Sequence, residues 1–262
     1  MGNKYLLIVE GAKTEQKIFS SVLKKYGFNV TVESKKLEID KFTLDHTNYE
    51  KDQKEIIIVQ GHRNRIHDFL KLFDSNESDL DRLFSNCSNC FQGIFLIYDV
   101  DHNNEKDIEK MFNKFPEETG GLLLLSSPCI EVLGEYDHSH ILKYNHLKEY
   151  KSYLNKFYNK KYGLSVEEYI IENFEELCLY YLEKNKEDFN EENIMEHPRL
   201  IIDKINSLNK RINCNDKEKS YVIYNYLTTV VYVFIAYING LTKEINNYSL
   251  VRDFFEKQYI HS

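Results

Sequence analysis

The sequence lacks the features that mark several large classes of protein. Its best apolar stretch, residues 226–238, is shorter than the roughly 18 residues that a membrane-spanning helix needs, and it contains two threonines. The five cysteines are odd in number and scattered, which argues against the disulfide framework of a secreted protein. The first residues lack the basic and apolar regions of a secretory signal. We therefore expect a cytoplasmic protein without a membrane-spanning segment.

Positive charge is also in short supply. The chain has 34 lysines and arginines against 42 aspartates and glutamates, a net charge of −8. No basic surface as large as a domain is therefore expected, and a nucleic-acid partner would need a local basic patch.

The sequence also lacks the four-ligand pattern of a structural zinc site. Cys87 and Cys90 form one C-x-x-C pair, but no second pair follows at a suitable distance, so a solvated loop is the favoured interpretation of this segment.

Four continuous apolar runs are present in the first half of the chain, at residues 4–9, 55–61, 93–99 and 121–127. Segments with helical periodicity, residues 14–27, 65–74 and 104–115, separate most of these runs, and residues 28–34 and 37–42 alternate like short strands or a hairpin. Continuous apolar strands are typical of a parallel sheet that is covered on both faces. The pattern predicts an α/β domain with a mostly parallel, Rossmann-like sheet between helices.

The pattern changes at about Tyr144. Three long, charged and tyrosine-rich stretches, residues 147–163, 165–185 and 220–241, have helical length and period, and Pro198 is the only proline after residue 144. We predict a catalytic α/β domain at residues 1–143 and an all-helical domain at residues 144–262. The many aromatic residues of the second domain are most simply explained by packing at helical spacing, rather than as platforms for stacking bases.

Acidic side chains follow the apolar runs. Glu10 ends the first run, Asp99 and Asp101 end the third, and Glu131 follows the fourth. In an open parallel sheet, functional groups gather beyond the carboxyl ends of the strands. Four carboxylates there would repel one another unless cations neutralised them, and oxygen ligands suit Mg²⁺ or Mn²⁺. Residues two apart on an extended segment point the same way, so Asp99 and Asp101 can reach one metal.

Each of these signals is weak when taken alone. An acid at a strand end is more often a cap or a loop carboxylate than a metal ligand. A D-x-D motif after an apolar strand also occurs in sugar-nucleotide transferases and aspartyl-phosphate phosphatases. A phosphatase of that class has a threonine where this chain has Asn103, and a transferase would not explain the Glu10–Gly11 pair. The combination of blocks is more specific.

The blocks "LLIVEGAKTE", "IIIVQG" and "FLIYDVD" together resemble the Toprim domain of topoisomerases, primases and OLD-type nucleases. The form "EG-x-x-TE", with Thr14 and Glu15, and the later "SSPCIEVLGEYDH" resemble the RloB-like and AriB-like Toprim proteins of bacterial anti-phage and abortive-infection systems. The resemblance covers about residues 4–140. It departs from the family pattern at Ile130, where an aromatic residue is usual, and near Leu133, where a tryptophan is usual.

The resemblance implies a magnesium-dependent nuclease. Glu10 would be a general acid/base or a metal ligand, Asp99 and Asp101 metal ligands, and Glu131 a further ligand, so that two cations could support phosphodiester hydrolysis. It implies tRNA or DNA as substrate and an ABC-type ATPase as partner, and it leaves a homodimer open. One alternative is a non-catalytic Toprim-like module that binds or regulates. Another is an enzyme that cleaves small phosphoesters.

Several further residues are candidates for binding substrate. His62, Arg63 and Arg65 form the clearest basic cluster and follow the second apolar run, where they could contact phosphates, although a solvated helix face explains them equally well. Lys13 could reach a phosphate from the loop after Glu10. Gly11 and Gly61 would let a phosphate approach the backbone. His138 and His140 follow Glu131 closely, and chance explains them better than a direct role does.

Overall fold

The computed structural model describes residues 4–11, 13–36, 55–61, 65–71, 91–99, 105–117, 121–127, 129–134, 147–178 and 227–228. The chain forms two compact units, residues 1–125 and 126–262. The division falls within the strand β6, Gly121–Ser127. The predicted domain boundary after residue 143 lies outside the described residues.

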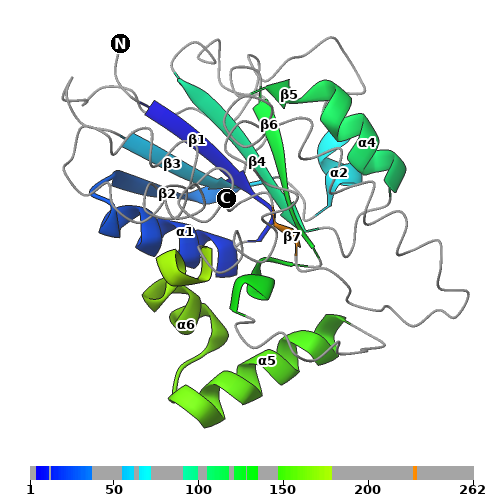
Figure 1. Ribbon diagram of the computed structural model, residues 1–262. Coiled ribbons are helices and arrows are strands. Elements are labelled where there is room, and N and C mark those ends of the chain that lie inside the picture. Colours follow the sequence, from blue (N-terminus) through cyan, green and yellow to red (C-terminus); the bar gives the residue numbers. More distant parts are fainter. Residues whose placement is uncertain are drawn as a thin grey trace, which may run out of the picture. The chain divides into compact units, whose positions relative to one another are not determined.

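A parallel sheet forms the centre of the first unit (Figure 1). Its strands are β1 (Lys4–Val9), β2 (Asn29–Lys36), β3 (Glu55–Gln60), β4 (Gly93–Asp99) and β6, and they lie in the order β2-β3-β1-β4-β6. A short strand, β5 (Pro116–Glu117), pairs antiparallel with β6. The predicted α/β class and the four apolar strands are thereby confirmed.

The central strand β1 explains why its sequence is apolar throughout. It pairs with β3 on one side and β4 on the other, with Leu7 opposite both Ile58 and Phe95. Every residue of the three strands is buried, as expected for strands with helices on both faces. The strand β2 pairs in parallel with β3. The segment 37–42, for which a strand or a hairpin was expected, lies outside the described residues.

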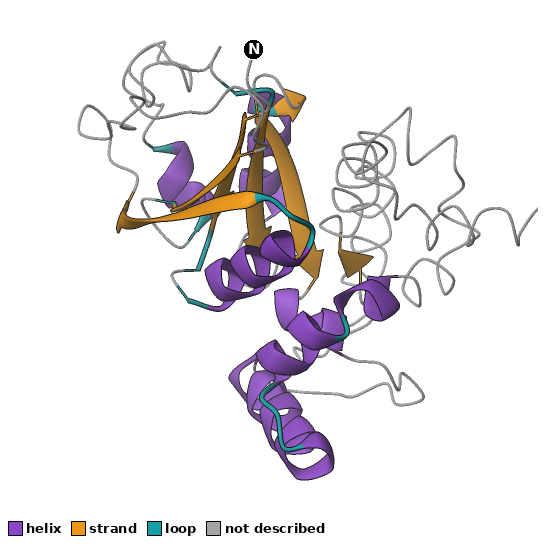
Figure 2. Cartoon of the chain, turned by 90° about the vertical axis from the view of Figure 1, so that its left-hand side faces the viewer, coloured by secondary structure: helices purple, strands orange, loops and turns teal. Residues whose placement is uncertain are grey.

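Helices cover the two faces of this sheet (Figures 1 and 2). The helices α2 (Ile66–Leu70) and α4 (Glu105–Lys114) pack on one face, where Phe69 and Met111 share a core cluster with Leu6 and Ile8 of β1. The helix α1 (Thr14–Lys25) lies on the other face and buries Phe19 and Val22. It ends at Lys25, two residues before the end of the predicted segment, and Gly27 just beyond its C-cap Tyr26 adopts a φ of 81°.

The second unit contains two longer helices and a short 3-10 helix. These are η2 (Ile130–Gly134), α5 (Leu147–Tyr162) and α6 (Val166–Glu172), and a further helical segment spans residues 174–178. Ser165 begins α6 with a reciprocal capping box: its hydroxyl accepts from the Glu168 amide at 3.2 Å, and the Glu168 carboxylate accepts from the Ser165 amide at 2.9 Å. Two of the three predicted helical stretches are therefore helical in the part of the chain that is described.

In the third stretch only two residues are described, and these two depart from the predicted helix. Leu227–Thr228 form the strand β7, which pairs antiparallel with Ser126 and Ser127 at the end of β6. The second unit is therefore not all helical. The backbone groups at an unpaired strand edge need partners, and a segment rich in threonine and valine is a good strand former. In the described residues, no helix has both the length and the apolar character needed to cross a bilayer.

Candidate active site

The carboxyl ends of β3, β1 and β4 lie side by side in the first unit. The Gly61 amide donates to the Val9 carbonyl at 2.9 Å, and the Glu10 amide donates to the Ile97 carbonyl at 2.9 Å. These two bonds extend the parallel ladder by one residue beyond each strand. Glu10, Gly61 and Asp99 are therefore held at one edge of the sheet, as the sequence predicts.

Glu10 and Asp99 are joined directly. The Asp99 amide donates a hydrogen bond of 2.7 Å to Glu10 Oε2, and the two residues are only 6% and 7% exposed. The bond orients the Glu10 carboxylate and holds the end of β4 against the end of β1. An ionised carboxylate can accept about four hydrogen bonds or metal contacts, so this bond still leaves Glu10 the capacity to bind a cation. Because the donor is the backbone of Asp99, the bond fixes the Glu10 carboxylate and not that of Asp99.

Tyr98 adds a buried hydroxyl near these acids. Its ring belongs to the core cluster and packs against Phe69 at a centroid distance of 5.9 Å. Burial, and secondarily the negative charge of Glu10, raises the pKa of Tyr98 well above its usual value of 10.0. The hydroxyl has no hydrogen-bond partner among the described residues. Tyr98 therefore stays neutral at physiological pH and could donate a proton in a hydrogen bond at this edge.

Glu15 is a buried acid to which the sequence analysis assigned no role. It lies in the first turn of α1 and is 6% exposed. Its carboxylate packs so tightly on Gly11 that a Cβ at that position would overlap Oε2 and lie 2.6 Å from Cδ. A side chain at residue 11 would therefore require the Glu15 carboxylate, the far end of a flexible side chain, to shift. The expectation that Gly11 lets a phosphate approach the backbone stays a prediction. In the sequence, the only sign that Glu15 belongs to this region was its place in the "EG-x-x-TE" motif.

Glu131 lies in the second unit, on η2, and is 6% exposed. Its Oε2 atom lies 3.1 Å from Lys151 Nζ of α5, an ion pair that lacks hydrogen-bond geometry. The lysine side chain is 34% exposed, so it reaches the acid from the surface. A buried carboxylate needs a positive partner, and Lys151 supplies one.

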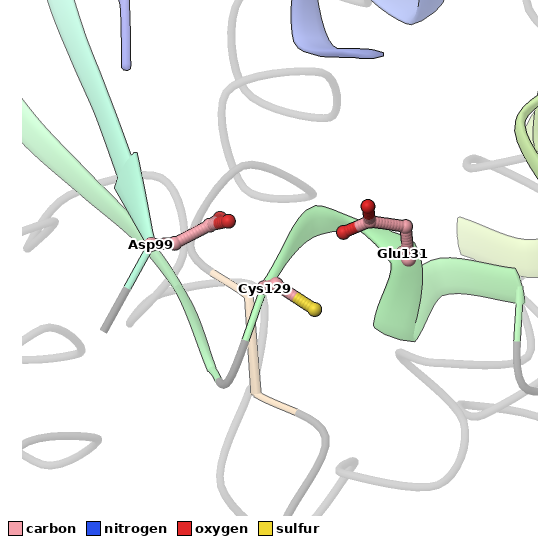
Figure 3. A group of neighbouring side chains, drawn as sticks. All are labelled: Asp99, Cys129 and Glu131. Atoms are coloured by element: carbon pink, nitrogen blue, oxygen red, sulfur yellow. The ribbon is translucent and has the colours of Figure 1, made fainter. Parts of the chain in front are cut away.

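One group of potential metal ligands is found in the described part of the chain. It consists of Asp99, Cys129 and Glu131, each of which is buried and offers one ligand atom within 4.8 Å of the others (Figure 3). The two carboxylates suit Mg²⁺ or Mn²⁺, whereas a thiolate suits Zn²⁺ and other transition metals. The donor set therefore fits a divalent cation without selecting magnesium. Cys129 was missed in the sequence, and its only signal was a position two residues before Glu131.

The other predicted residues are placed as follows. Lys13 is exposed and immediately precedes α1, and Arg65 is exposed and immediately precedes α2. Gly61 is buried. The remaining candidates lie outside the described residues, and they are Asp101, His62, Arg63, Cys87, Cys90, His138 and His140.

Comparisons with known proteins leave the family of this chain open. No family model matches the sequence, and no curated protein and no solved structure matches it significantly.

Proposed function

We propose that the protein is a metal-dependent nuclease that hydrolyses phosphodiester bonds in RNA or DNA. The observation that carries the proposal is the pair of buried acids, Glu10 and Asp99, joined by a 2.7 Å hydrogen bond at the carboxyl edge of a parallel sheet. Functional groups gather beyond the carboxyl ends of parallel strands, so two buried acids at this edge support the proposal.

Four acidic residues would serve as ligands for the cation. Glu10 and Asp99 would hold a divalent cation, with Asp101 and Glu131 as further ligands by the Toprim-like resemblance. A bound cation of this kind would activate water and stabilise the leaving oxygen. The hydrogen bond from the Asp99 amide would keep the Glu10 carboxylate in place before the cation arrives, which lowers the entropy cost of binding.

The Toprim-like resemblance adds a cation, a biological role, a substrate and a partner to the proposal. We propose Mg²⁺ or Mn²⁺ as the cation, a role as effector in a bacterial anti-phage system, tRNA as a strong candidate substrate, and an ABC-type ATPase as partner. The acidic net charge of −8 supports an effector with modest intrinsic affinity for nucleic acid, whose binding depends on a cation or a partner.

The test is a cleavage assay with labelled tRNA and plasmid DNA, in Mg²⁺ or Mn²⁺, on the wild-type chain and an Asp99→Asn variant. We expect metal-dependent cleavage that falls by about 10²–10⁴-fold in the variant, since an essential group in a hydrolytic site is lost. Glu109→Gln is the matched control, because Glu109 is an exposed acid on α4 and its loss should leave the rate unchanged.

Calorimetry with Mn²⁺ separates the outcomes. Cation binding by the wild type that Asp99→Asn abolishes, together with cleavage, supports the proposal. Cation binding without cleavage of either polymer, even when an ABC-type ATPase partner is added, would favour the non-catalytic module instead. Hydrolysis of a small phosphodiester without cleavage of polymers would identify a small-substrate enzyme.

A further inference from the structure

The helix α5 has a charge opposite to that of the chain as a whole. Its 16 residues, "LKEYKSYLNKFYNKKY", contain five lysines and one glutamate, in a protein with a net charge of −8. The helix also contains five aromatic residues, four tyrosines and one phenylalanine. Such a helix provides the local basic patch that a nucleic-acid partner of this acidic protein would need.

The helix has two distinct sides. Tyr150, Leu154 and Tyr158 recur every four residues and are buried, so they form the side that packs within the second unit. They confirm that part of the aromatic content serves packing. The lysines lie off this stripe, and Lys156, Lys160 and Lys161 are exposed.

Aromatic rings lie among these exposed lysines. Tyr153 and Phe157 are half-buried and stacked, with ring centroids 6.1 Å apart and planes inclined by 26°. Lys161 Nζ lies over the Phe157 ring, 5.2 Å from its centroid, and 5.0 Å from the centroid of the Tyr162 ring. Tyr162 itself is 41% exposed, which is unusual for a large aromatic residue. We name Tyr153, Lys156, Phe157, Lys160 and Lys161 the α5 face.

We propose that the α5 face binds single-stranded nucleic acid. Lysines contact phosphates, and accessible aromatic rings stack with unpaired bases. A surface that carries both residue types therefore favours a single strand over other polyanions. A duplex would hide its bases, so it would use the lysines alone. This inference rests on the proposed nuclease function and adds to it the form of the substrate: an unpaired segment such as an RNA loop or a displaced DNA strand.

The lysines are tested through the salt dependence of binding. Fluorescence anisotropy would follow a labelled single-stranded oligonucleotide of about 20 nucleotides, as RNA and as DNA, in EDTA so that no cleavage occurs. In Lys156→Gln/Lys160→Gln/Lys161→Gln, the slope of log K against log salt should fall by about 2, because each phosphate contact contributes about 0.7 for a single strand. The matched control is Lys17→Gln/Lys24→Gln/Lys25→Gln, which removes the same charge from exposed positions on α1 and should leave the slope close to that of the wild type.

The aromatic contribution is tested at Tyr153. Tyr153→Ala should weaken binding of the single strand by about 5- to 150-fold, whereas Tyr153→Phe, which keeps the ring, should bind like the wild type. Binding of a duplex of the same length should not respond to either change. A purely structural tyrosine would give an equal loss for single and double strands.

The outcomes distinguish this inference from the proposed function. If the α5 and α1 triple variants bind equally, or if the wild type binds no single strand, the inference is wrong, and metal-dependent cleavage would still stand or fall by the Asp99→Asn assay. If Asp99→Asn binds the single strand like the wild type but does not cut it, while the α5 variant binds poorly, both proposals are supported.

Discussion

The hydroxyl of Tyr98 is buried beside the candidate site without a hydrogen-bond partner among the described residues. Removing such a group relieves its desolvation penalty, so Tyr98→Phe should raise the free energy of unfolding by about 1 kcal/mol in chemical denaturation at neutral pH. Tyr5→Phe is the matched control on the neighbouring strand, because the Tyr5 hydroxyl donates to Gln92 Oε1 at 2.7 Å. That variant should lose about 1 kcal/mol. A loss in both variants would show that Tyr98 makes a bond that matters to the fold.

Tyr98→Phe should also change how the free energy of unfolding depends on pH above 10. The pKa of Tyr98 is raised in the folded state, chiefly by burial and then by Glu10, whereas it is near 10 in the unfolded chain. Below pH 10 both states are protonated and the contribution of Tyr98 to stability is fully present. Above pH 10 the unfolded chain ionises first, so stability is lost as the pH rises. Tyr98→Phe should therefore show a shallower loss of stability above pH 10.

The contact between Gly11 and Glu15 can be tested by a double-mutant cycle. Gly11→Ala should destabilise the fold by about 1 kcal/mol, the low end for an added methyl group, because the buried Glu15 carboxylate must shift but ends a flexible side chain. In a Glu15→Ala background the same change should have little effect, giving an interaction free energy of about 0.5–1 kcal/mol in denaturant unfolding. Gly27→Ala is the control: Gly27 has nothing within 4 Å but a φ of 81°, so its cost should not depend on residue 15. Equal costs of Gly11→Ala in both backgrounds would contradict the contact.

At the scale of elements, α5 is tied to η2 by the Lys151–Glu131 ion pair of 3.1 Å. Lys151→Met should lower the free energy of unfolding by about 1–2 kcal/mol, less than for a fully buried pair because Lys151 is 34% exposed.

The same variant tests whether Glu131 is a metal ligand, because Mn²⁺ bound to Glu131 should replace the lost positive charge. The rise in melting temperature on adding Mn²⁺ should be larger for Lys151→Met than for the wild type. Lys148→Met, one turn earlier and exposed, controls for the loss of charge. An equal Mn²⁺ effect in all three chains would remove Glu131 from the ligand set.

The elements of the first unit were predictable because their signals are local. The four apolar runs form β1, β3, β4 and β6, and α1 lies within the predicted segment 14–27. The strand β7 was not predictable, because its pairing with Ser126 and Ser127 joins segments about 100 residues apart in sequence. A short apolar segment can satisfy either a helix or a strand, and the partner that is available in the fold decides.

At the scale of the whole molecule, composition described an acidic chain and argued against a basic surface as large as a domain, leaving only a local basic patch open. The structure instead shows charge segregated by element, with exposed lysines gathered on α5 around half-buried rings. A net charge is a sum over the chain, so it does not report how the charges are distributed. The prediction that the tyrosines serve packing holds for Tyr150 and Tyr158, while Tyr153 and Tyr162 retain accessible surface.

The sequence by itself determined the α/β class of the first unit and the acids that end its strands, because burial requires apolar runs and parallel strands end at a common edge. Only the tertiary structure decided which groups contact one another. The bond from the Asp99 amide to Glu10, the packing of Glu15 on Gly11, and the pairing of Lys151 with Glu131 depend on the register and orientation of separate elements. Such contacts join residues whose distance in space is set by packing, and no local pattern in the sequence encodes that distance.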